Sequence, residues 1–146
     1  MKKLLWVMLV LIFTGMALGG TASADEKFAR VLNASEPGMP FDISTHAVEG
    51  KTTIFDFYSK YCGPCVRIAP KLEELDRKRD DVVVFKLNIN RKGISGIDWK
   101  SPLVAQYKLR SVPTFFIYNP QKKVTHSGPQ ATRKVVELLK ESGIEF

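Results

Sequence analysis

The sequence predicts an α/β fold in which a central mixed β-sheet is flanked by helices. Two observations lead to this expectation. In the first half of the chain, short apolar runs alternate with a helical pattern, whereas in the second half two short runs follow each other across a tight turn. A β-α-β unit followed by a β-hairpin and a closing helix produces a mixed sheet with helices on both sides.

The first expected elements precede the cysteines. Asp25 can cap a short helix that continues to Leu32 and is broken at residues 35–38, which contain Pro and Gly. Residues 53–58 are apolar at nearly every position, as is typical of a strand buried on both faces. Asp56 is the exception in this strand.

A helix and a second buried strand complete the β-α-β unit. The helix begins at Pro64, which suits a first helical turn, and its apolar positions continue to Leu75. Pro70 is expected to kink it. The strand covers residues 82–89 and is interrupted by one charge, Lys86.

The second half begins with an irregular, glycine-containing segment, residues 91–100, followed by a short helix over 101–107. Strands are expected at 114–118 and 123–127, joined by a turn. An amphipathic helix ended by Gly143 closes the domain.

Residues 1–24 are predicted to be a signal peptide. They combine a basic start, an apolar run over 4–18 and a small-residue A-x-A site at 22–24. The run is shorter than the roughly 20 residues of a membrane-spanning helix, so an anchor formed by an uncleaved N-terminus is the alternative. Residues 25–146 fit one domain, expected to be periplasmic or otherwise extracytoplasmic.

The charge balance is mildly basic, with 22 Lys and Arg against 15 Asp and Glu. No aromatic and basic motif accompanies this charge, so we expect no nucleic-acid partner. The sequence contains no internal repeat or heptad seam, and we expect a monomer.

Cys62 and Cys65 are the only cysteines. Because no other pair is present to act as a structural staple, this pair is free to cycle between dithiol and disulfide. Structural zinc needs four ligands, and the other soft candidates, His46 and His126, form no second local pair. Covalent haem attachment needs histidine after the second cysteine, where Val66 stands. We therefore expect no metal or cofactor.

Several short motifs in family-like order give the chain a close resemblance to the thioredoxin family. They are Asp56-Phe57-Tyr58, Tyr61-Cys62-Gly63-Pro64-Cys65, Ile68-Ala69-Pro70, Lys86-Leu87-Asn88-Ile89, Val112-Pro113-Thr114 and Gly128. The resemblance implies a thioredoxin fold, with Cys62 as the exposed nucleophile and Cys65 as the buried resolving thiol. It also implies a cis bond between Val112 and Pro113.

The sequence departs from the usual thioredoxin pattern around the cysteines. Tyr58 and Tyr61 stand where thioredoxins usually carry tryptophan, and Val66 stands where lysine is common. The segment between Ile89 and Pro113 is longer than usual by about eight residues, and long loops are often functional. These changes concern the rim of the site and leave its redox residues in place.

Thiol-disulfide exchange requires a thiolate, and an ordinary cysteine, with a pKa of about 8.5, is mostly protonated at neutral pH. A helix N-terminus lowers the pKa of a thiol placed there, as is expected for Cys62. Cys65 lies one helical turn further and can attack a mixed disulfide. Gly63 and Pro64 stiffen the turn between them and, with Tyr61, are expected to contact the substrate.

Asp56 is the candidate base for Cys65. In the strand it points to the same face as Ile54 and Tyr58, and desolvation should raise its pKa toward the working range. Lys86, on the neighbouring strand by resemblance, can pair with Asp56 and limit that rise. The alternative is a buried ion pair with no role in exchange.

Two further positions are candidates for substrate binding. The backbone of Val112, beside Pro113, can hydrogen-bond an extended segment as an added strand does, and the alternative is a tight turn. Trp99 lies in the long loop and is either an anchor for a docked partner or a side chain that packs its own loop.

The favoured function is a dithiol reductase of protein disulfides, because the Gly63-Pro64 dipeptide resembles reducing thioredoxins. Its partners would be exported proteins that bear thiols or disulfides, together with a transmembrane electron donor. A thiol oxidase or disulfide isomerase is the alternative. A non-catalytic binding module on the same scaffold is a third possibility, which the intact cysteine pair disfavours.

Overall fold

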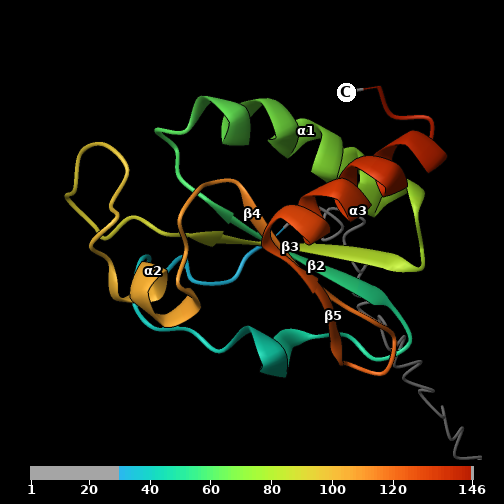
Figure 1. Ribbon diagram of the computed structural model, residues 1–146, viewed down its shortest axis with the longest axis horizontal. Helices are drawn as coiled ribbons and strands as arrows, with labels where there is room; N and C mark the ends of the chain where they lie inside the picture. Colours follow the sequence, from blue (N-terminus) through green and yellow to red (C-terminus); the bar gives the residue numbers. More distant parts are fainter. Residues whose placement is uncertain (1–29, 146) are drawn as a thin grey trace, which may run out of the picture.

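The computed structural model describes residues 30–145 and shows the expected mixed sheet with helices on both faces. The strands lie in the order β1-β3-β2-β4-β5 (Figure 1). Strands β1 (Arg30–Val31), β3 (Val82–Asn88) and β2 (Thr52–Tyr58) are parallel. Strands β4 (Thr114–Tyr118) and β5 (Val124–Ser127) continue the sheet in antiparallel pairing.

Helices α1 (Gly63–Lys78) and α3 (Gly128–Glu141) cover one face of the sheet, and α2 (Pro102–Tyr107) lies on the other (Figure 1). The short 3-10 helix η2 (Ile43–His46) packs on the same side as α2. The strands, helices and irregular segment expected from Thr52 onward are therefore confirmed, with small differences at their ends. No helix among residues 30–145 is long and apolar enough to cross a membrane.

Apolar side chains form a separate core on each face of the sheet. The core under α1 and α3 is made of aliphatic residues with one phenylalanine, whereas the core under α2 is rich in aromatic rings. Strand β2 supplies both cores because its residues alternate between the faces: Ile54 packs under α1, and Phe55 and Phe57 pack under α2. This explains why the strand reads as a continuous apolar run.

Helix α1 starts directly after β2, and its local sequence explains its position. Cys62 is the N-cap and Pro64 lies in the first turn, where a missing N–H costs nothing. The buried positions Cys65, Ile68, Leu72 and Leu75 recur every three or four residues and form one stripe against the sheet.

The expectation of a helix continuing to Leu32 is wrong for the residues described here. Arg30 and Val31 form the edge strand β1, which pairs with Phe85 and Lys86, and the Leu32 N–H donates to the Lys86 carbonyl at 3.0 Å. The open edge of β3 offers unpaired backbone groups, and pairing with them satisfies this segment better than an isolated short helix does. The predicted signal peptide, residues 1–24, lies outside the described residues.

Candidate active site

Cys62 and Cys65 form a disulfide across the first turn of α1, with their Cα atoms 5.2 Å apart. The Cys65 N–H donates to the Cys62 Sγ at 3.2 Å, so the sulfur of Cys62 caps the helix. A thiolate at this position is stabilised by the same N–H and by the helix dipole. The geometry therefore favours Cys62 as the thiol that ionises after reduction.

The expectation that Cys62 is exposed and Cys65 buried needs correction for the disulfide form. The two residues are 4% and 2% exposed, so their accessibility hardly differs. The Val112 carbonyl oxygen lies 3.3 Å from the Cys62 Sγ and covers part of that sulfur. What separates the two cysteines is their place in the helix: Cys62 lies at the cap, and Cys65 faces the core with Ile68.

The loop before β4 brings a second part of the chain to the disulfide. The Val112–Pro113 peptide bond is cis, as the resemblance implied. The Val112 carbonyl is directed at Cys62, and the loop is held by the Thr114 hydroxyl, which donates to the Ser111 carbonyl at 2.6 Å. Sequence positions 62 and 112 are thus adjacent in space, and the loop contributes to the redox site as well as forming a turn.

Asp56 is completely buried in the centre of β2, and neither of its carboxylate oxygens has a hydrogen-bond partner. It shares a sheet face with Ile54, which packs under α1, so it lies on the same side of the sheet as Cys65. Burial raises the pKa of the Asp56 carboxyl from 3.8 to about 7, and the charge of Lys86 moderates this rise. A carboxyl with this pKa can accept a proton near neutral pH.

Lys86 lies opposite Asp56 in the parallel pairing of β2 and β3, but it makes a different ion pair. Its Nζ lies 3.9 Å from the Glu73 Oε1 and 4.8 Å from the centre of the Tyr58 ring. The buried ion pair that we considered between Asp56 and Lys86 is therefore not formed in this structure. Lys86 instead acts on Asp56 through its charge alone.

Comparison with known proteins identifies the family of this site. Residues 40–141 match the family model described as Thioredoxin. The chain belongs to the thioredoxin family. Among curated proteins it is similar to chloroplastic thioredoxin F2 of Arabidopsis thaliana, with 38% identity over 78 residues. That match covers 53% of this chain and 38% of the relative, so the chain spans well under half the length of this relative.

Solved thioredoxin structures share the fold. The short form of thioredoxin f from spinach chloroplast is 26% identical with a TM-score of 0.53, and the match covers 80% of this chain and 94% of that one. A chain in the crystal structure of the complex between ferredoxin:thioredoxin reductase and thioredoxin f2 has the same TM-score and coverage, with 28% identity. The thioredoxin fold predicted from the sequence is confirmed.

Three side chains around the cysteine pair stand at positions where this chain departs from the usual thioredoxin pattern. Tyr61 is 42% exposed, and the Lys60 Nζ lies 5.1 Å from the centre of its ring. Val66 is 59% exposed, so it lies on the outer side of α1 and not in the apolar stripe of the helix. Tyr58 is partly buried, and desolvation raises its pKa, with a further contribution from the charge of Asp56.

Trp99 lies in the long loop between β3 and α2 and is 44% exposed. The loop is ordered by Arg91 and Asp98, whose side chains form two hydrogen bonds of 2.7 and 3.0 Å, and by a contact from Asn90 to the Gly96 carbonyl. Arg91 holds the pKa of the Asp98 carboxyl below its usual range through these hydrogen bonds. The docking role of Trp99 stays a prediction.

Two residues near the site were not singled out from the sequence. The Arg67 guanidinium folds back toward the cysteine turn, with its Nη1 3.4 Å from the position that a Cβ on Gly63 would occupy. Glu73 is the ion-pair partner of Lys86. Gly63 and Arg67 are four residues apart on a helix, and this spacing is the one sequence signal that could have indicated the approach of Arg67 to Gly63.

Proposed function

We propose that this protein is an exported thiol-disulfide oxidoreductase that acts mainly as a dithiol reductase of protein disulfides. The observation that carries the proposal is the Cys62–Cys65 disulfide at the N-terminus of α1, with the Val112 carbonyl beside one sulfur and the buried Asp56 on the same side of the sheet as the other. The Gly63-Pro64 dipeptide between the cysteines supports the reducing direction.

In the proposed reaction the protein starts as the dithiol. The Cys62 thiolate attacks one sulfur of a substrate disulfide, which forms a mixed disulfide and expels the first substrate thiolate. The Cys65 thiol then gives its proton to the Asp56 carboxylate and attacks the Cys62 sulfur. This step releases the second substrate thiolate and leaves the Cys62–Cys65 disulfide, so two electrons have passed to the substrate.

The cycle requires an electron donor that reduces the Cys62–Cys65 disulfide again. For an exported protein we propose a transmembrane reductase in this role. The structure of thioredoxin f2 in complex with ferredoxin:thioredoxin reductase supports the general arrangement, in which a separate protein engages a thioredoxin. The substrates proposed here are exported proteins with accessible disulfides, and Val112 would bind an extended substrate segment through its backbone.

Insulin reduction tests the activity and its direction. We expect the domain from residue 25 onward to reduce insulin disulfides when a dithiol reductant is supplied, and we expect a reduction potential near the value of about −270 mV known for thioredoxin. A potential near about −120 mV, typical of a strong periplasmic oxidant, would contradict the reductase and favour the oxidase. Absence of any exchange with insulin or with small disulfides would contradict both.

Export can be tested with the full chain in a Gram-negative host. We expect the periplasmic fraction to contain protein whose N-terminus lies near Asp25, because the A-x-A site precedes this residue. A matched variant that lacks residues 4–18 should stay in the cytoplasm. Recovery of the intact chain from the membrane fraction would contradict cleavage and favour the anchored alternative.

A further inference from the structure

The two chain segments that meet at the disulfide are basic and contain no carboxylate. Residues 57–72 span the end of β2, the cysteine turn and the first half of α1, and their charged residues are Lys60, Arg67 and Lys71. Residues 99–136 run from Trp99 through the Val112 loop into α3, and they also contain Lys and Arg but no Asp or Glu.

Three of these cations lie on the short chain segments that form the redox site. The Arg67 guanidinium folds toward Gly63, the residue that directly follows Cys62. The Lys60 ammonium lies over the ring of the neighbouring Tyr61. Arg110 lies two residues before Val112, whose carbonyl is 3.3 Å from the Cys62 sulfur. Lys60, Arg67 and Arg110 are all exposed, and we refer to them as the cationic rim.

The cationic rim is not neutralised by the protein. Among residues 30–145, none of its three side chains takes part in an ion pair. Away from the disulfide some cations are paired, since Lys78 contacts Glu74 at 2.8 Å and Arg79 contacts Asp81 at 2.6 Å, whereas others such as Lys122 and Lys123 form no ion pair within the described part of the chain. The cationic rim is therefore distinguished by its position, because its three cations lie on the segments that form the redox site and these segments contain no Asp or Glu.

The placement of Arg67 is electrostatically unfavourable for the helix itself. The N-terminus of a helix carries partial positive charge and favours acidic neighbours, yet the first turn of α1 contains no acidic residue. Cations close to this end gain nothing from the helix dipole. Such cations can instead act on negative charge at the sulfurs, which is either the Cys62 thiolate itself or an acidic segment of a bound substrate.

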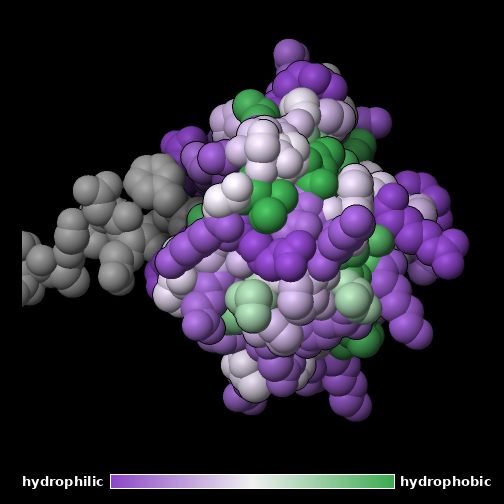
Figure 2. Space-filling model, turned by 90° about the vertical axis from the view of Figure 1, so that its left-hand side faces the viewer, coloured by the Kyte–Doolittle hydropathy of each residue, from purple (hydrophilic) through white to green (hydrophobic). Residues whose placement is uncertain are grey.

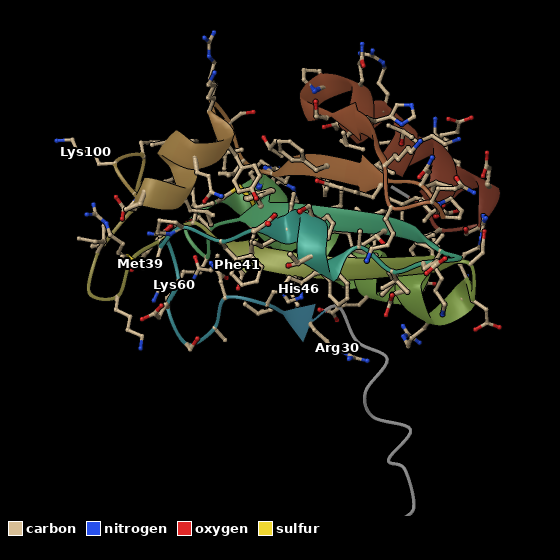
Figure 3. All side chains as sticks on the ribbon, turned by 90° about the horizontal axis from the view of Figure 1, so that it is seen from below. Arg30, Met39, Phe41, His46, Lys60 and Lys100 are labelled. Carbon is tan, nitrogen blue, oxygen red and sulfur yellow. A yellow bond between two sulfur atoms is a disulfide. The ribbon has the colours of Figure 1, made fainter. Side chains whose placement is uncertain are left out.

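A groove extends the cationic rim along the Val112 loop. Its volume is about 350 Å³, and it is lined by Lys108, Arg110 and Ser111 on one side and by Ser127 and Gly128 on the other. A substrate segment that hydrogen-bonds to the Val112 backbone would continue into this groove. Lys60 and Lys100 lie at the same end of the molecule (Figure 3), and hydrophilic side chains form a broad band across this end (Figure 2).

We propose that the cationic rim selects protein substrates whose reactive disulfide is flanked by Asp or Glu. This inference rests on the proposed function and names the class of substrate that the same site prefers. Acidic flanks would be attracted to Lys60, Arg67 and Arg110 during encounter, which raises the rate of formation of the mixed disulfide. Because the rim is exposed, salt should screen the preference, with a Debye length of about 10 Å at 0.1 M.

The test uses three synthetic peptides that contain the same disulfide and differ only in flanking residues, which are Glu, Gln or Lys. The rate constant for oxidation of the reduced protein by each peptide is measured by rapid quenching and mass spectrometry. At low ionic strength we expect the Glu peptide to react about tenfold faster than the Lys peptide, and the ratio to fall toward one near 1 M salt.

Two matched variants assign the preference to the rim. In the triple variant K60Q/R67Q/R110Q, the ratio of the Glu-peptide rate to the Lys-peptide rate should fall close to one. The control K122Q/K123Q/K140Q removes the same charge from the β4–β5 turn and from the end of α3, and it should keep the ratio. The ratio is the readout because loss of Arg67 can change the reactivity of Cys62 toward all three peptides equally.

Three outcomes would overturn the inference. Equal rates for the Glu and Lys peptides, with normal reaction of the Gln peptide, would overturn it and leave the proposed function standing. A ratio that survives in the rim variant would place the selection elsewhere and overturn the role of these three residues. Failure of all three peptides to react would overturn the proposed function and this inference with it.

Discussion

Cys62→Ser should abolish turnover in insulin reduction, whereas Cys65→Ser should accumulate a mixed disulfide with the substrate. The reason is the position of each sulfur relative to helix α1. The Cys62 sulfur caps α1 and receives the Cys65 N–H at 3.2 Å, so its thiolate is stabilised. Cys65 faces the core and is suited to the second attack, which resolves the intermediate.

The two single-cysteine variants can be compared directly. Each is mixed with an activated disulfide substrate, and the rate of adduct formation is followed by mass spectrometry. We expect Cys65→Ser to form the adduct at least about a hundredfold faster than Cys62→Ser, since the two thiols differ in ionisation and in place. Comparable rates would contradict the assignment of Cys62 as the nucleophile.

Asp56→Asn should slow resolution of the mixed disulfide by about a hundredfold and change its formation much less. The first step needs only the Cys62 thiolate, whereas the second needs removal of the Cys65 proton. With a pKa of about 7, Asp56 should also give the resolution rate an inflection near neutral pH, which the asparagine variant should lack. Single-turnover kinetics across pH separates the two steps, and equal slowing of both would leave Asp56 with a structural role only.

The same carboxyl should make stability depend on pH in a defined direction. Its pKa is about 7 in the folded protein and near 3.8 in the unfolded chain, so between these values the folded state holds one more proton. Its contribution to the free energy of unfolding therefore falls as pH rises from about 4 to about 7. Above this window Asp56→Asn should stabilise the oxidised protein by about 1 to 4 kcal/mol.

Asp98→Asn is the matched control because Asp98 is also buried but is paired with Arg91. Its pKa is lowered by that pairing, so its contribution is present above the pKa of the unfolded chain and is lost as pH falls. This substitution should destabilise the protein at neutral pH. Urea unfolding of both variants at pH 4 and pH 8 checks the two signs, and destabilisation by Asp56→Asn at pH 8 would contradict the unpaired, buried carboxyl.

Local pattern alone predicted much of this protein. The apolar run of β2, the spacing of the buried positions of α1 and the turn between β4 and β5 each depend on neighbours within a few residues, and each was found as expected. The cysteine pair could be recognised for the same reason, because one helical turn fixes the distance between residues 62 and 65.

Family resemblance added features that local pattern could not supply. The cis bond before Pro113 and the place of Lys86 on the strand beside Asp56 both came from the likeness to thioredoxins, and both are present. The burial of Asp56 followed from the sequence because a single carboxylate within an apolar strand has no route to water.

Contacts between distant parts of the chain were decided only by the tertiary structure. Residues 30–31 pair with β3 because hydrogen bonding to the open sheet edge outweighs their weak local preference for a helix. Lys86 forms its ion pair with Glu73 because α1 passes within reach of the lysine side chain. Cys62 is nearly as buried as Cys65 because the Val112 loop, fifty residues away, lies against it. The sequence by itself determined the sheet, the helices and the redox pair. The burial of Cys62 by the Val112 loop, the unpaired state of Asp56 and the assembly of the cationic rim depend on long-range packing that no local pattern encodes.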